Sequence, residues 1–130
     1  MNFFGNKTCE DLTKVIQSGN LNKLRHLNLS HTYLYSLIDP IIIVLLQLCN
    51  SLYSLDLSYS LLSNDGTIKL SKILLKFAIL KNLDLKYNGI RNSAAISLLE
   101  NLPFNLKKLN LIGNDISKDI IEKINIQCII

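Results

Sequence analysis

Leucines recur along this chain in a fixed pattern. Four segments fit the template L-x-x-L-x-L-x-x-(N/S/T)-x-(L/I), and every apolar position of the template is Leu or Ile in all four copies. The segments span residues 24–34, 52–62, 80–90 and 106–116, so their starts lie 28, 28 and 26 residues apart. Self-similarity at a fixed period of this length is the signature of a protein built from stacked structural repeats.

The centre of each copy predicts a short β-strand. The L-x-L core alternates with a period of two, which is typical of a strand with one buried face. The ninth position begins the turn that leaves the strand, where an Asn side chain can bond nearby backbone and Ser or Thr can do so more weakly. The four copies place Thr32, Ser60, Asn88 and Asn114 there.

A helix is expected after each strand. In the first copy, Asp39 is a suitable N-cap with Pro40 at the first helical position. In the third copy, Ser93 precedes a helical segment. The second copy carries one helical face, at i, i+3, i+4 and i+7, made of Leu70, Ile73, Leu74 and Phe77. Strand and helix alternating at this period predict an α/β solenoid with about four parallel strands on its concave side, helices on its convex side and right-handed crossovers.

The flanks of the four copies predict two more helices within a single domain of 130 residues. Residues 8–11, Thr-Cys-Glu-Asp, resemble a capping box, which predicts a capping helix over residues 9–18 within the N-terminal 1–20. The last helix is expected from Ser117 to about Gln127. The closing Cys128-Ile129-Ile130 is apolar, so either it tucks into the core or the chain is part of a longer repeat array.

Across about residues 21–130 this pattern resembles the leucine-rich-repeat superfamily. The 28-residue period with a full helix is similar to the ribonuclease-inhibitor-like class, and residues 80–90 match that class best. A second resemblance, to the cysteine-containing class of ubiquitin-ligase substrate receptors, rests on residues 49–57, which begin with Cys49. The resemblance implies a non-enzymatic protein-binding module that uses its strand-lined face. The alternative is an adaptor or substrate-recognition subunit of a larger complex, ubiquitin-ligase-like or GTPase-regulating.

Columns of side chains on the strand face are the predicted partner site. Neighbouring strands lie about 4.7–4.9 Å apart, so equivalent residues of successive copies should lie side by side. Tyr offers a large apolar area with one polar tip and is a common interface anchor, and here two tyrosines accompany two carboxylates. The alternative is a polar face that only keeps the protein soluble. The predicted partner-binding residues are Asn28, His31, Tyr33, Asp56, Tyr59, Asp84, Lys86 and Tyr87.

The helix side of the first repeat is a second candidate interface. In the second repeat the solvent-facing helix positions are expected to be Lys69, Lys72 and Lys76. Their counterparts 28 residues earlier are Ile41, Val44 and Leu48. Leaving such residues in water forgoes about 1.5–3 kcal/mol each. Either the N-terminal segment with Phe3 and Phe4 covers them, or they form a convex interface to a partner or to a second copy in a homo-oligomer.

The amino-acid composition indicates which cellular compartment and which cofactors to expect. The formal net charge of +4 is a weak hint of an acidic partner. Cys9, Cys49 and Cys128 are odd in number and lack metal-type spacing, so we expect no disulfide framework, metal or cofactor. The cytoplasm is the simplest reducing compartment, with a secreted or host-delivered effector as the alternative. The most apolar run, residues 40–46, is far short of the roughly 20 residues that cross a bilayer.

Enzymatic and nucleic-acid-binding functions are not expected. The sequence contains no G-x-S-x-G, phosphate-binding glycine loop or H-E-x-x-H motif. His26 and His31 lie five residues apart on one strand-to-turn segment and make a poor metal pair. The last two repeats carry a cluster of lysines, namely Lys81, Lys86, Lys107 and Lys108. A column formed by Asp56 and Asp84 would repel phosphates, so nucleic acid is an unlikely partner and a weak RNA binder stays an alternative.

Overall fold

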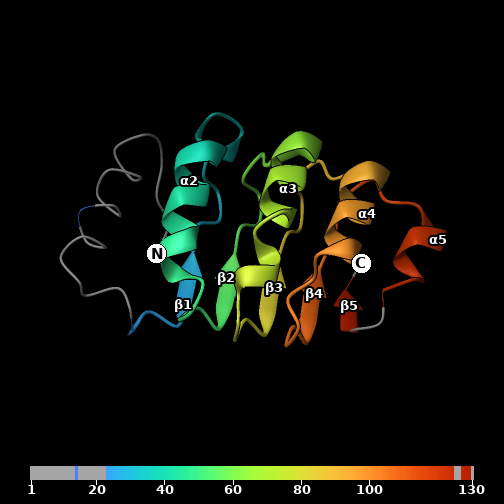
Figure 1. Cartoon of the computed structure of the whole chain (residues 1–130). Helices are drawn as coiled ribbons and strands as arrows, with labels where there is room; N and C mark the ends of the chain where they lie inside the picture. Colours follow the sequence, from blue (N-terminus) through green and yellow to red (C-terminus); the bar gives the residue numbers. More distant parts are fainter. Residues whose placement is uncertain (1–13, 15–22, 125–126, 130) are drawn as a thin grey trace.

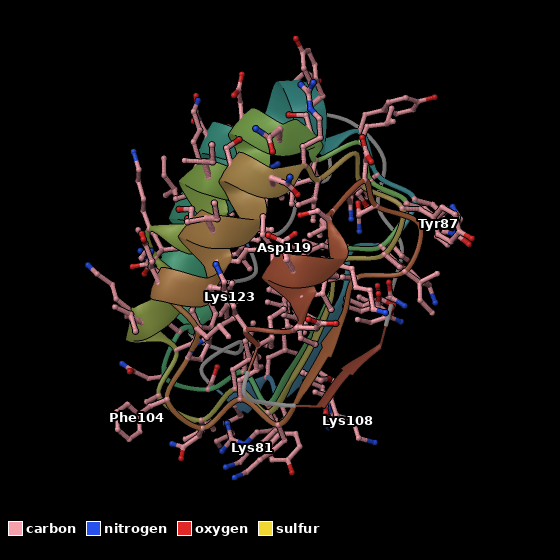
Figure 2. The ribbon with its side chains drawn as sticks, turned by 90° about the vertical axis from the view of Figure 1, so that its right-hand side faces the viewer. Lys81, Tyr87, Phe104, Lys108, Asp119 and Lys123 are labelled. Carbon is pink, nitrogen blue, oxygen red and sulfur yellow. The ribbon has the colours of Figure 1, made fainter. Side chains whose placement is uncertain are left out.

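Strands and helices alternate along the chain and form two layers. A computed structural model describes residue 14, residues 23–124 and residues 127–129, in which the elements stand side by side in chain order (Figure 1). Figure 2 shows the helices as one layer and the strands as the other. The parallel strands of the single described sheet follow the order β1 (His26–Asn28), β2 (Ser54–Asp56), β3 (Asn82–Asp84), β4 (Lys108–Asn110) and β5 (Gln127–Ile129). The helices are α2 (Leu34–Leu48), α3 (Ser63–Ser71), α4 (Asn92–Glu100), α5 (Lys118–Ile121) and the short 3-10 helix η2 (Leu74–Lys76).

The sheet pairs residues that hold the same place in the sequence pattern. The central leucines of β1 to β4 lie opposite one another in the order Leu27, Leu55, Leu83 and Leu109. All four are buried in the core, as the period-two alternation predicts. The predicted α/β class, with parallel strands alternating with helices, is therefore confirmed.

The C-terminal segment forms a strand where a helix was expected. Helix α5 ends at Ile121, and β5 pairs with β4 so that Cys128 lies opposite Leu109. The prediction of a helix reaching about Gln127 is therefore wrong, and β5 adds a strand to the four that the repeats predicted. The physical reason is the edge of β4, whose unpaired backbone N–H and C=O groups accept another short strand.

The first helix begins earlier than the sequence indicated. It starts at Leu34 and encloses Pro40, so Asp39 and Pro40 do not form its N-terminus. Proline removes one backbone hydrogen-bond donor from a helix interior. For this reason Pro40 was expected at the start of the helix. The Asp39 carboxylate instead lies 3.0 Å from the Lys69 ammonium on α3.

The proposed convex interface of Ile41, Val44 and Leu48 is wrong, because all three side chains are buried in the core. Helix α2 is continuous over 15 residues, so its buried positions keep the 3.6-residue period through Leu48. In the second repeat α3 ends at Ser71 and a separate 3-10 turn follows, which has three residues per turn. The buried positions of α2 therefore lie one residue earlier than the 28-residue offset from the second repeat implies. The exposed apolar residue of this part of α2 is Ile43.

The second repeat has the predicted buried and exposed positions, but the single helical face through Phe77 is wrong, because α3 ends at Ser71 and Ile73, Leu74 and Phe77 lie beyond it. Its predicted core side chains are buried, namely Leu70, Ile73, Leu74 and Phe77. Its predicted solvent-facing side chains are exposed, namely Lys69, Lys72 and Lys76. The helix predicted over residues 9–18, and Phe3 and Phe4, lie outside the described residues.

Candidate functional site

The predicted carboxylate column shapes the turns that leave the strands. The Asp56 Oδ1 atom accepts hydrogen bonds from the Ser58 N–H at 2.9 Å and the Ser58 hydroxyl at 2.6 Å. Asp84 accepts the Lys86 N–H at 3.1 Å, and Asn28 accepts the Ser30 N–H at 2.8 Å. Each side chain thus closes an Asx turn onto the residue two positions later. The oxygen atoms of these side chains already accept hydrogen bonds from groups of the chain itself, so the column has a structural role in the turns.

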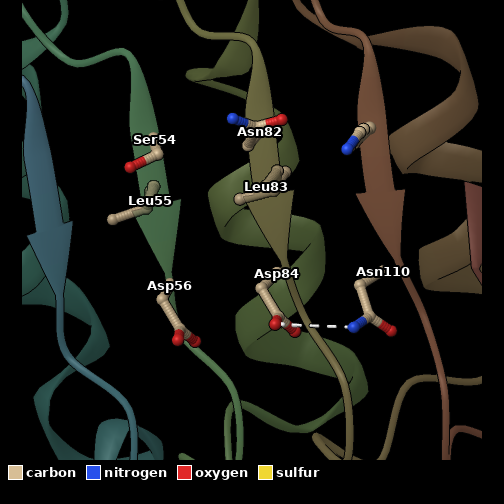
Figure 3. A pocket seen from close by; sticks show the side chains of 8 residues that line it. Ser54, Leu55, Asp56, Asn82, Leu83, Asp84 and Asn110 are labelled. Atoms are coloured by element: carbon tan, nitrogen blue, oxygen red, sulfur yellow. Dashed lines mark hydrogen bonds between the residues drawn. The ribbon is translucent and has the colours of Figure 1, made fainter.

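A shallow hollow lies on the sheet face beside this column. It has a volume of about 330 Å³, and its lining includes Asp56, Asp84, Lys108 and Asn110 (Figure 3). The Asn110 amide donates to Asp84 Oδ2 at 3.5 Å, and the Lys86 ammonium lies 3.6 Å from the same oxygen. Among the described residues, no three His, Cys, Asp or Glu side chains are grouped in a way that could hold a metal ion.

Three rings stack in a ladder just beyond the strands. The ring centroids of His31 and Tyr59 lie 4.8 Å apart with planes 5° from parallel, and those of Tyr59 and Tyr87 lie 4.7 Å apart at 13°. Backbone bonds continue the sheet into this row, since the N–H groups of His31, Tyr59 and Tyr87 each donate to the next segment. The Lys86 ammonium lies 6.0 Å from the Tyr59 ring centroid, within cation–π range. The prediction that equivalent residues of successive copies lie side by side is confirmed for His31, Tyr59 and Tyr87.

The ladder residues share a strained backbone conformation. His31, Tyr59 and Tyr87 have φ angles of 59°, 53° and 53°, and Leu61 and Ser63 follow with 48° and 67°. A left-handed conformation of this kind costs about 1–3 kcal/mol at a non-glycine residue and persists where the surroundings enforce it. All five follow β1, β2 or β3 along the chain, and Ser63 is the first residue of α3. The strain is concentrated at the edge of the sheet where the strands end.

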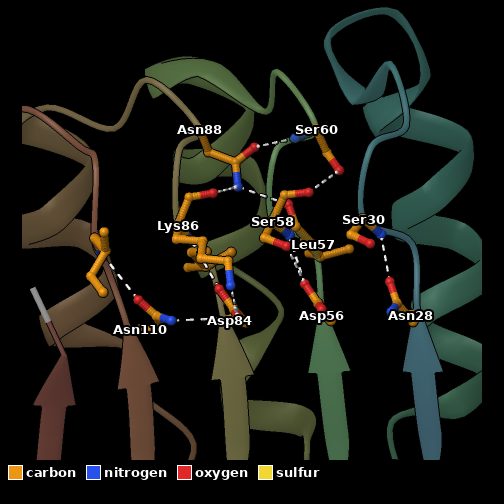
Figure 4. A network of polar contacts seen from close by, with 12 residues as sticks. Asn28, Ser30, Asp56, Leu57, Ser58, Ser60, Asp84, Lys86, Asn88 and Asn110 are labelled. Carbon is orange, nitrogen blue, oxygen red and sulfur yellow. Dashed lines mark hydrogen bonds and ion pairs between the residues drawn. The ribbon is translucent and has the colours of Figure 1, made fainter. Parts of the chain in front are cut away.

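The side-chain amides of Asn88, which is buried, and Asn114 bond to the backbone of that strained edge (Figure 4). The Asn88 carbonyl oxygen accepts the N–H groups of Ser60 and Leu62 at 3.0 and 3.1 Å, on either side of Leu61. Its NH₂ group donates to the Leu57 carbonyl at 2.8 Å. Asn114 repeats the arrangement one copy later, accepting the N–H of Asn88 at 3.0 Å. The ninth position thus bonds local backbone, as predicted, and also ties each segment to the preceding one.

Gly113 ends the ladder. It occupies the place of a fourth ring, has φ of 74°, and a Cβ atom there would lie 2.3 Å from the Tyr87 ring. The Tyr87 ring therefore lies against the backbone at Gly113, where a residue other than glycine would place its Cβ atom in the space of the ring.

Replacing Gly113 by Ala should displace the Tyr87 ring. We expect the free energy of unfolding to fall by about 2–4 kcal/mol, from left-handed strain and overpacking together, with a changed tyrosine signal in near-ultraviolet circular dichroism. Gly89→Ala is the matched control, because Gly89 has φ of 70° but its Cβ would meet only Ser63 Cα at 3.9 Å. Equal losses in the two variants would contradict the ring position.

Exposed apolar side chains gather around the ladder. We call the aromatic edge the set of His31, Tyr33, Tyr35, Tyr59, Leu61 and Tyr87. Tyr33 and Tyr35 are 62% and 72% exposed, and they line an apolar hollow of about 410 Å³ with Leu61 and Tyr87. Arg91 lies at this hollow, and its backbone N–H donates to the Asn64 side chain at 3.0 Å. The arrangement offers an apolar cavity with a cation beside it.

Sequence reasoning found part of the aromatic edge and missed the rest. It proposed Tyr33, Tyr59 and Tyr87, but it did not propose Tyr35, because the first helix was expected to begin at Pro40. It did not propose Leu61 or Arg91 either. The signal that would have found Tyr35 is an aromatic residue in the first turn of a helix that starts directly after the ninth template position.

The carboxyl group of Asp119, which lies far from the aromatic edge in the sequence, has a lowered pKa. A hydrogen bond from the Ser117 side chain, in the first place, holds the pKa of Asp119 in α5 below its usual value (Figure 2). Asp119 is fully exposed and lines none of the hollows described above.

Comparisons with known proteins leave the geometry as the basis for function. No known protein-family model matches this sequence, and no curated protein matches it. None of the described helices is long and apolar enough to cross a lipid bilayer.

Proposed function

We propose that this chain is a leucine-rich-repeat protein that binds another protein through its aromatic edge, without catalysing a reaction. The observation that carries the proposal is the gathering of exposed Tyr33, Tyr35 and Leu61 around an apolar hollow. Keeping one such side chain in water forgoes about 1.5–3 kcal/mol relative to burial. Exposed apolar patches of this kind mark interaction sites.

The rigidity of the edge supports the same proposal. Stacked rings and buried Asn88 fix the hollow before any partner arrives. A preformed site avoids part of the entropy loss that binding otherwise requires. Tyrosine also brings large contact area with few rotatable bonds, which is why it is enriched among interface anchors.

The proposal refines the expected site. Asn28, Asp56 and Asp84 are assigned to the turns, and the partner is assigned to the segments beyond the strands, with Lys86 and Arg91 as cations beside the rings. An adaptor or substrate-recognition role within a larger complex uses the same edge and is the alternative within this class.

Tyr33→Ala combined with Leu61→Ala should abolish most partner binding. Hot-spot side chains cost about 2 kcal/mol or more each on truncation, so we expect at least a 30-fold loss of affinity. Neither residue belongs to the ring stack, so the fold should persist. The measurement is quantitative affinity capture from the cells that produce the protein, followed by titration of the captured partner.

Ile43→Ala combined with Ile96→Ala is the control, since both residues are exposed on the solvent faces of α2 and α4. We expect this variant to retain wild-type affinity. Loss of the partner from the control but not from the edge variant would move the interface to the helices.

A further inference from the structure

The opposite edge of the sheet, where β1 to β4 begin, carries cations, and the described segments that lead directly into these four strands contain no carboxylate. Residues 23–25, 49–53, 77–81 and 101–107 lead into β1 to β4, and none of them is Asp or Glu. The nearest carboxylate preceding these segments is Glu100, the last residue of α4. We call the basic edge the set of Lys23, Arg25, Lys81, Lys107 and Lys108 with the exposed rings of Tyr53 and Phe104.

Backbone hydrogen bonds align the basic edge into a column. The Tyr53 N–H donates to the Arg25 carbonyl at 2.6 Å, the Lys81 N–H donates to Tyr53 at 2.8 Å, and the Lys107 N–H donates to Lys81 at 2.8 Å. Along this column the residues are a cation, an aromatic residue and two further cations, and neighbouring segments lie about 4.8 Å apart. Like charges in equivalent positions of adjacent strands repel each other, which an anionic partner would relieve.

None of these cations is in an ion pair between described residues, where the pairs are Lys69 with Asp39 and Lys86 with Asp84. Figure 2 shows Lys81, Lys108 and Phe104 at the bottom of the view and Tyr87 well above them on the right-hand side. The basic edge is thus a surface separate from the aromatic edge.

The structure weakens the objection that Asp56 and Asp84 would repel phosphates. A strand rises about 3.3 Å per residue, so Asp84 lies roughly 10 Å along the chain from Lys81. Its carboxylate turns to the Lys86 N–H and ammonium, away from the strand start. Asp56 is likewise bonded to Ser58. Of the basic edge, Lys108 lines the hollow that includes Asp56 and Asp84, and the other cations do not line it.

We propose that the basic edge binds single-stranded nucleic acid. Phe104 is 98% exposed and open to a flat partner, whereas Tyr53 is 41% exposed and meets the His26 ring edge-to-face at a centroid distance of 6.0 Å. A nucleotide brings a phosphate and a base together, and single-strand-binding surfaces combine a cationic track with stacking rings. An acidic peptide would use the cations but has no general need for the rings. The inference is independent of the aromatic edge and its protein partner.

The test is fluorescence anisotropy of the full chain with a fluorescein-labelled 15-nucleotide oligouridylate. With four phosphate contacts, affinity should fall about 50-fold between 50 and 200 mM KCl. Lys81→Glu with Lys107→Glu should lower affinity at 50 mM at least about tenfold and flatten the slope of log affinity against log salt by about 1.4. Phe104→Ala should lower affinity about 5- to 150-fold and leave the slope unchanged.

Lys69→Glu with Lys118→Glu is the matched control, because it makes the same charge change at exposed residues of α3 and α5. We expect less than a threefold loss, and circular dichroism checks that every variant is folded. Three results would overturn the proposal. They are no anisotropy change at 50 mM KCl, an equal loss in the control, or an unchanged affinity for Phe104→Ala together with displacement of the RNA by a 15-residue polyglutamate. The last result would assign the basic edge to an acidic protein.

Discussion

Asn88→Ala is expected to lower the free energy of unfolding by about 3–5 kcal/mol. Asn88 is 2% exposed, and its side chain satisfies the N–H groups of Ser60 and Leu62 and the Leu57 carbonyl. Alanine leaves these backbone groups buried without a partner, at about 1–3 kcal/mol for each. Chemical denaturation followed by circular dichroism measures the effect. The aromatic edge should also loosen, because Leu61 lies between two of the bonded amides.

Two comparisons isolate the cause of that loss. Asn105→Ala removes an exposed amide that makes one bond, to the Ala78 carbonyl, and should cost less than about 1 kcal/mol. Asn88→Ser should fall between them, because Ser60 fills the equivalent place one copy earlier and its hydroxyl donates to Leu29 at 3.0 Å. An alanine variant as stable as the wild type would show that the buried network contributes nothing.

Ile41→Lys combined with Leu48→Lys is expected to unfold the protein. Both side chains are at most 2% exposed, and an unpaired buried ammonium costs several kcal/mol. Total stabilities of small domains are only about 5–15 kcal/mol, so two such charges should exceed what the fold can tolerate. Loss of the helical circular dichroism signal in buffer is the measurement.

Ile43→Lys is the control, since Ile43 lies on the same helix and is 63% exposed. This variant should unfold at nearly the wild-type denaturant concentration. If the double variant instead stayed folded and only its oligomeric mass changed, the first helix would present a convex interface after all.

The strands and the core were predictable because their signal is local and repeated. A period of two around Leu27, Leu55 and Leu83 fixes which face is buried, and equal spacing fixes the register. The row of His31, Tyr59 and Tyr87 followed from the same register. Stacking of their rings did not follow, because it depends on left-handed backbone that sequence spacing does not encode.

The helices were less predictable because their phase depends on where each begins and how it ends. A shift of one residue turned Ile41 from an expected surface position into the core. Pro40 indicated a helix start, but it lies inside α2, which begins at Leu34. Strand β5 was missed because its three residues, Gln127–Ile129, carry too little pattern to separate a strand from a helix end.

The central claim is that a protein partner docks on the aromatic edge. Site-specific photo-crosslinking tests it most directly, with benzoylphenylalanine placed at Tyr35 in the apolar hollow or at Ile96 on the solvent face of α4. We predict that the partner is cross-linked from position 35 with at least tenfold higher yield than from position 96. An equal or higher yield from position 96 would contradict the claim.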